Sequence, residues 1–130
     1  MGVSKFSPAV QARLARANAM IAEEADTYAH MMQAELVELA MAMSERDYTR
    51  MHDIAYDIES RAGTFDWPLV TQAAGMMREL INEGHGLCPA MEAIRDSIAL
   101  MMRNDLKGMT AEGRVLLETL RAAVKRELGT

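Results

Sequence analysis

The sequence predicts an all-α protein, an up-and-down four-helix bundle with an additional N-terminal helix and a broken C-terminal helix. Apolar residues recur every three or four positions along most of the chain, the spacing of a helix with one buried face. No segment alternates apolar and polar residues as a half-buried strand does. The polar breaks between the periodic segments are short, as is typical of antiparallel helices in bundles.

Length and composition indicate one soluble domain, which we expect to comprise residues 1–130. Half of the residues are apolar and a quarter are charged. The net charge of -5 argues against a protein that binds nucleic acid, since such proteins carry a basic face. A single cysteine, Cys88, rules out an internal disulfide, and no Cys/His cluster has the spacing of a zinc site. We therefore expect no metal and no cofactor.

The chain shows no targeting or membrane segment. Basic residues are spread through the first twenty positions, which lack the apolar run of a signal peptide. Nowhere does an apolar run approach the length of about 18 residues that a membrane span requires. These features predict a cytoplasmic protein without a membrane partner.

The first two helices are predicted over Pro8–Glu23 and Asp26–Met43. Ser7 is placed as an N-cap with Pro8 in the first helical position, a favoured combination at helix starts. Apolar residues then follow at helical spacing in both segments: Val10, Leu14, Ala17 and Ile21 in the first, and Tyr28, Met32, Leu36, Leu39 and Met43 in the second. The polar stretch 44–47 ends the second helix.

A third helix is predicted from Tyr48 to Gly63 or slightly beyond, and a fourth ends near Gly84. Asp66 is expected to cap the fourth helix, with Pro68 in its first turn. The stretch 84–89 has two glycines and a proline and is predicted to be a loop. A fifth helix follows from Pro89, broken at 107–110 by a glycine and a capping threonine before a final helix.

The third helix carries an apolar stripe and an unusual polar strip. Its apolar residues gather on one side, which must be buried: Met51, Ile54, Ala55, Ile58 and Ala62. The strip on the other side contains Thr49, His52, Tyr56, Glu59, Ser60 and Gly63. Most such strips are simply solvated helix faces. An exposed aromatic side chain and two small residues that lower helix propensity instead favour a functional surface here.

The stretch that begins at Tyr56 resembles the signature of bacterial histidine phosphotransfer (Hpt) domains, which runs roughly H-D-[ILM]-K-G-Q-[AG]-G-[ST]-F-G-[YF]-P-L-[VIL]-T. An aromatic residue of that signature corresponds to Trp67. The identical or equivalent positions are Asp57, Ile58, Ala62, Gly63, Thr64, Phe65, Pro68, Leu69, Val70 and Thr71. The resemblance is strongest over residues 51–71, and it implies a bundle of Hpt type. Fold agreement alone would be weak support, because helical bundles host many functions.

The departures from the signature fall on its reactive residues. Tyr56 stands where the family has the histidine that accepts a phosphoryl group from one receiver aspartate and passes it to another. Glu59 replaces the family's lysine, and Ser60 the glycine that leaves room for the partner. A phenol with a pKa of about 10 is almost wholly protonated at pH 7 and is a poor nucleophile without an activating base. The resemblance therefore implies a degenerate domain, a pseudo-Hpt, that cannot carry phosphate on Tyr56.

These observations predict a non-enzymatic bacterial signalling module that binds a response-regulator receiver domain or a histidine kinase in a two-component phosphorelay. The predicted docking face is Thr49, His52, Glu59, Ser60 and Gly63 around Tyr56. One alternative is an active phosphocarrier that uses His52 or Tyr56. Another is a structural or oligomeric bundle unrelated to phosphorelay. The sequence leaves the oligomeric state open.

Overall fold

The structure is a computed structural model that describes residues 7–129. Within that range all of the regular secondary structure is helical, and there is no strand. Its helices are α1 (Pro8–Glu45), α2 (Tyr48–Thr64), α3 (Pro68–Asn82), α4 (Pro89–Arg103) and α5 (Ala111–Leu128). The predicted all-α class is confirmed.

Helix α1 corrects the prediction of a separate N-terminal helix. The two segments expected over 8–23 and 26–43 are parts of one continuous helix of 38 residues. The residues between them, Glu24 and Ala25, are neither glycine nor proline, so nothing there removes a backbone hydrogen bond or favours a turn. The chain divides into two compact units, residues 1–31 and 32–130.

The first four helices end in the same way. A residue with positive φ follows each of them, namely Arg46, Asp66, Gly84 and Asp105. The next residue donates its backbone N–H to a carbonyl five positions earlier, over 2.7 to 3.0 Å. This is the Schellman arrangement, which satisfies carbonyls that a helix end leaves without partners.

Asp66 therefore has a different role from the predicted one. Its φ of 61° places it in the left-handed region, after the end of α2. The N-cap of α3 is Trp67, whose side chain does not cap the helix with a hydrogen bond, while Pro68 occupies the first turn as predicted. The Hpt signature quoted above has glycine where this chain has Asp66, and Asp is one of the few other residues that tolerate this conformation.

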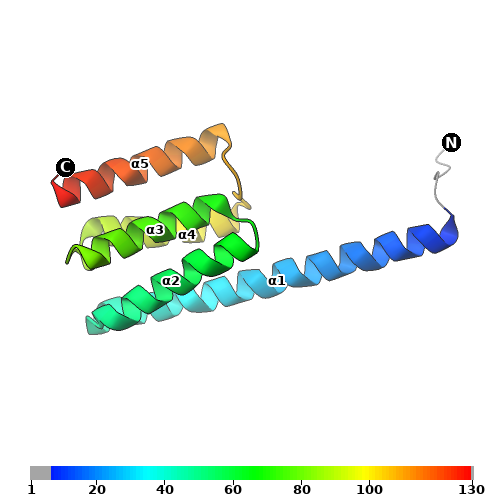
Figure 1. The fold of residues 1–130 in the computed structure, drawn as a ribbon, viewed down its shortest axis with the longest axis horizontal. Coiled ribbons are helices and arrows are strands. Elements are labelled where there is room, and N and C mark those ends of the chain that lie inside the picture. Colours follow the sequence, from blue (N-terminus) through cyan, green and yellow to red (C-terminus); the bar gives the residue numbers. More distant parts are fainter. Residues whose placement is uncertain (1–6, 130) are drawn as a thin grey trace. The chain divides into compact units, whose positions relative to one another are not determined.

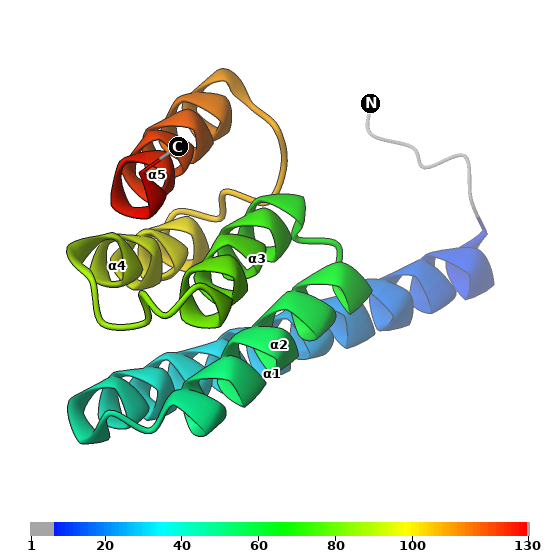
Figure 2. The same ribbon diagram turned by 60° about the vertical axis from the view of Figure 1, so that its left-hand side comes forward.

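Helices α2 to α5 run in alternating directions (Figure 1). Helix α3 packs against α2, α4 and α5, and α4 also packs against α5 (Figure 2). All five residues of the predicted apolar stripe of α2 are buried, and the stripe of α3 is buried through Leu69, Ala73, Met76 and Leu80. The core of residues 32–130 forms where these faces meet, since burying apolar surface is the main favourable term in folding.

The C-terminal region is broken, as predicted, but the break begins earlier. Helix α4 ends at Arg103, and the segment 104–110 leads to α5, where the Thr110 hydroxyl accepts a hydrogen bond from the Gly113 N–H over 3.1 Å. Helix α5 then runs back beside α4 (Figure 1).

The segment between α4 and α5 also contacts the start of α3. The backbone N–H of Leu69 donates to the Lys107 carbonyl over 3.2 Å, and the Lys107 ammonium lies 5.3 Å from the centre of the Trp67 ring. Gly113 lies so close to Leu69 that a Cβ atom built on it would be 2.6 Å from Leu69 Cδ1. The turn between α2 and α3 is thus held by residues far along the chain.

None of the helices in the described part of the chain has the length and apolar character needed to cross a membrane.

Candidate docking site on helix α2

The predicted polar strip lies on the surface of α2. The side chain of Tyr56 is 52% exposed, although it is one of the larger apolar groups of the chain. Thr49, Ser60 and Gly63 are exposed, whereas His52 and Glu59 are partly buried. Nothing lies within 4 Å of a Cβ atom built on Gly63. The small residues therefore leave open space beside the tyrosine on the same helix.

Glu59 is paired with Arg78 of α3. The Glu59 carboxylate accepts two hydrogen bonds from Arg78 Nη2, at 2.8 and 3.1 Å, and one from Nε at 3.2 Å. Both side chains are partly buried, with exposures of 22% for Glu59 and 32% for Arg78. A fork of guanidinium donors on one carboxylate is among the stronger polar contacts in proteins.

Arg78 also contacts the tyrosine. Its guanidinium carbon lies 5.7 Å from the centre of the Tyr56 ring, within the range of a cation–π interaction. Arg78 thus joins Tyr56 and Glu59, and α3 helps to fix the orientation of two residues on α2. A Cβ atom at Gly75 of α3 would lie 3.0 Å from Glu59 Oε2, so a side chain there would crowd the carboxylate that Arg78 holds.

This pairing changes the electrostatic expectation for the site. From the sequence, Glu59 places a negative charge beside Tyr56. In the structure that charge is balanced by the Arg78 guanidinium at hydrogen-bonding distance. The surface beside Tyr56 therefore carries a neutral ion pair, which repels an anion less than an unpaired Glu59 carboxylate would.

Arg78 and Gly75 are site residues that the sequence did not reveal. Neither belongs to the apolar stripe of α3, and neither lies in the stretch 56–71 that resembles the Hpt signature. Only the packing of α3 on α2 brings them to Tyr56 and Glu59. The only sequence feature that pointed to Arg78 was its position as a basic residue beside the apolar stripe of α3. Basic residues at such positions are common on solvated helix faces.

The histidines make separate local contacts. His52 lies 3.9 Å from the carboxylate of Asp53, its sequence neighbour. Nδ1 of the exposed His30 donates to the Asp26 carbonyl over 2.8 Å. His85 has a partner that the sequence did not predict, since its Nδ1 lies 3.1 Å from the Glu127 carboxylate of α5. That pair joins the loop before α4 to the end of the chain.

Further ion pairs hold α2 against the last turns of α1. Arg50 Nη2 donates to Glu38 over 2.9 Å and Arg50 Nη1 lies 3.6 Å from Glu45. Arg61, which replaces a glutamine of the Hpt signature, pairs with Glu35. The acidic residues Glu35 and Glu38 are thus partners of α2 and not a simple solvated face. They fix the helix that carries the candidate site.

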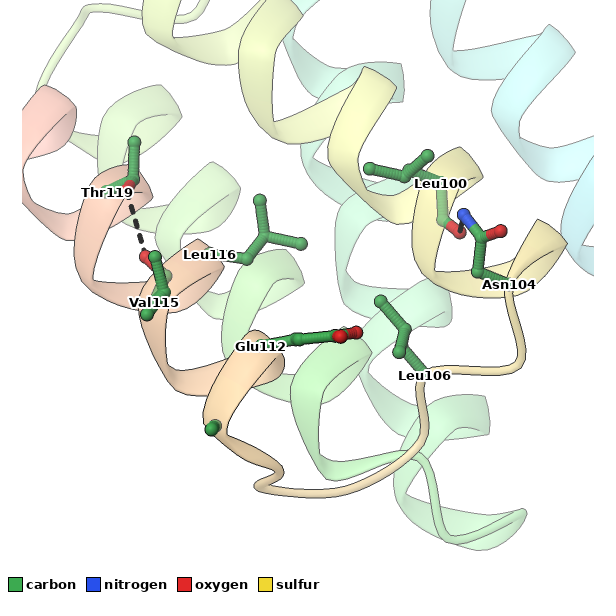
Figure 3. A pocket seen from close by; sticks show the side chains of 8 residues that line it. Leu100, Asn104, Leu106, Glu112, Val115, Leu116 and Thr119 are labelled. Carbon is green, nitrogen blue, oxygen red and sulfur yellow. Dashed lines mark hydrogen bonds between the residues drawn. The ribbon is translucent and has the colours of Figure 1, made fainter.

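A pocket of about 830 Å³ lies elsewhere, between the end of α4 and the start of α5. Its walls are mostly apolar and include Leu100, Leu106, Val115 and Leu116. The charged side chain of Glu112 reaches from the start of α5 toward Leu106 (Figure 3). None of the predicted docking residues lines it. The pocket and the Tyr56 surface are therefore separate features.

Among residues 7–129, no group of three or more His, Cys, Asp or Glu side chains is arranged to hold a metal ion. Cys88 is a free, buried thiol at the N-cap position of α4.

Comparison of the chain with known protein-family models, curated proteins and solved structures found no match in any of the three.

Proposed function

We propose that the surface of α2 around Tyr56 is a docking surface of Hpt type, which binds a receiver domain or a histidine kinase without carrying phosphate. The observation that carries the proposal is an exposed tyrosine at the acceptor position, flanked on its own helix by the exposed small residues Ser60 and Gly63. The surrounding residues match the Hpt signature over one dense stretch.

An up-and-down four-helix bundle of Hpt type fits the contacts within residues 32–130. Ion pairs join the end of α1 to α2, and Arg95 of α4 lies 3.7 Å from the sulfur of Met43 on α1. Helix α2 packs on α3, and α3 packs on α4. These contacts support a ring of four helices, with α5 outside it against α3 and α4.

The chemistry of the site favours binding over phosphotransfer. A phenol is a weak nucleophile at neutral pH unless a base removes its proton. The Tyr56 ring faces the Arg78 guanidinium, which has no lone pair to accept a proton and is itself held by Glu59. The rigid aromatic ring instead offers a large contact area of the kind that is enriched at protein interfaces.

A pairwise binding screen tests the proposal. The purified chain is titrated against receiver domains and histidine kinases of its own organism, and at least one is expected to bind. Tyr56→Ala should weaken that binding at least tenfold. Tyr48→Ala is the matched control, because Tyr48 is a second tyrosine of α2 with an exposure of 50%, and its loss should change affinity less than about twofold. Absence of binding to every candidate would contradict the proposal.

Phosphorylation tests the alternative of an active carrier. The chain is incubated with a phosphorylated receiver domain and analysed by mass spectrometry, and we expect no phosphoryl group on His52 or Tyr56. A phosphorylated residue would overturn the non-catalytic assignment. A triple variant gives a second test, and it combines Tyr56→His, Glu59→Lys and Ser60→Gly. This variant should gain phosphotransfer if the docking face is intact, whereas a bundle with an unrelated structural role would gain none.

A further inference from the structure

The N-terminal half of α1 has an exposed apolar face. Every residue from Gln11 to Thr27 is exposed, although the segment lies inside a continuous helix. Leu14 and Ile21 have exposures of 45% and 64%. Helices in proteins owe most of their stability to packing of such a face against a partner, and isolated segments of this length are marginal in water.

Four apolar residues of this half of α1 form one stripe. Val10, Leu14, Ala17 and Ile21 follow one another at intervals of three or four residues, which keeps them on the same side of a helix. This is the a/d spacing of a two-helix coiled coil, in which apolar residues of one helix pack between those of a partner helix. The stripe is therefore suited to a second helix.

Charges beside the stripe select the orientation of that partner. Arg13 and Glu24 are 11 residues apart, close to three turns at about 3.6 residues per turn, so they flank the stripe on the same side. Consider two identical antiparallel helices aligned so that Ala17 of each copy lies opposite Ile21 of the other. In this alignment Arg13 of each copy lies at the level of Glu24 of the other copy, to within about one residue or ~1.5 Å along the helix axis. A parallel pair would instead place the two Arg13 side chains on opposite flanks of the interface, where neither of them meets a Glu24.

We propose that residues 8–27 form an antiparallel two-helix interface with the same segment of a second copy of this chain. The inference is independent of the proposed docking function, because it rests on α1 and not on the Tyr56 surface. Each twofold-symmetric pair would make two Arg13–Glu24 contacts and bury both copies of Leu14 and Ile21. The segment is only about 30 Å long, so the dimer is expected to dissociate in the micromolar range.

Sedimentation velocity of the full chain over a range of concentrations tests the interface. The chain is expected to pass from monomer to dimer, and Ile21→Glu should raise the dissociation constant at least tenfold. Val37→Glu is the matched control, because Val37 is also an exposed β-branched residue of α1, with an exposure of 58%, and lies outside the proposed interface. A chain that stays monomeric throughout, or a dimer that Ile21→Glu leaves unchanged, would overturn the proposal.

Charge reversal tests the antiparallel orientation. Arg13→Glu and Glu24→Arg should each weaken the dimer about threefold to tenfold, and the double variant should recover the original affinity to within about threefold. Single variants that weaken the dimer without recovery in the double variant would contradict the antiparallel pairing. Circular dichroism verifies that each variant keeps its helical content. A monomeric chain that binds anionic lipid vesicles through this stripe would assign the face to a membrane and overturn the dimer.

Discussion

The ion pair between Glu59 and Arg78 should contribute measurably to stability. An exposed ion pair contributes about 0 to 1 kcal/mol, and removing one partner of a fully buried pair costs about 3 to 5 kcal/mol. This pair lies between those limits, because its side chains are 22% and 32% exposed and share three hydrogen bonds of 3.2 Å or less. We expect a coupling free energy of about 1 to 2 kcal/mol.

Urea unfolding of Glu59→Ala, Arg78→Ala and the double variant measures that coupling through a double-mutant cycle. The cycle is needed because Arg78→Ala also removes the contact with the Tyr56 ring. A coupling free energy below about 0.3 kcal/mol would refute the reasoning, since it would match a fully solvated pair.

Glu59→Lys should destabilise more than Glu59→Ala, by about 2 kcal/mol relative to the original chain, because it replaces the pair with two cations. The double variant Glu59→Lys with Arg78→Glu should recover most of the lost stability. The triple variant designed to gain phosphotransfer contains Glu59→Lys and would lose this ion pair. It should therefore be compared with the double variant Tyr56→His with Ser60→Gly, which keeps the Glu59–Arg78 pair.

Three further changes test the packing and the protonation states. Gly113→Ala should destabilise the chain by about 1 to 3 kcal/mol, because its Cβ atom would collide with Leu69. Gly63→Ala should stabilise α2 by up to about 1 kcal/mol, because its Cβ atom would meet no other atom. Chemical denaturation measures the unfolding free energy of both variants. Asp66→Gly should raise the unfolding free energy by about 0.5 to 1 kcal/mol because φ there is 61°, and an unchanged thermal midpoint would contradict this. Burial raises the pKa of Tyr28 to about 12. Between pH values of about 10 and 12 the folded chain keeps the phenol protonated, whereas the unfolded chain has lost the proton. The unfolding free energy should therefore fall by up to about 2 to 3 kcal/mol as the pH rises from about 10 towards 12. Tyr28→Phe should remove that fall in unfolding curves measured at alkaline pH.

Features that depend on local periodicity could be predicted from the sequence. The stripe of α2 follows directly from side-chain spacing, and Ile58 and Ala62 are buried as expected. The boundaries of α2 were also accessible, since Asp47 caps it and a turn follows Thr64. Such signals arise within one turn of helix and need no knowledge of the rest of the chain.

Features that depend on contacts between helices could not be predicted. Arg78 joins the candidate site only because α3 packs on α2, and its pairing with Glu59 spans 19 positions of sequence. The continuity of α1 was missed because the polar residues Glu24 and Asp26 suit a helix surface as well as a break. Whether Tyr56 serves a docking surface is a chemical question about a partner, which periodicity does not address.

The contacts that hold the turn between α2 and α3 have a consequence for how the chain folds. Lys107 supplies both a carbonyl to the Leu69 N–H and an ammonium to the Trp67 ring, and Gly113 closes against Leu69. During synthesis, the stretch that resembles the Hpt signature emerges well before these residues, so it cannot complete its packing until most of the chain has been made. Because contacts between distant residues slow folding, the backbone amides of this turn should be among the last in residues 32–130 to become protected from hydrogen exchange.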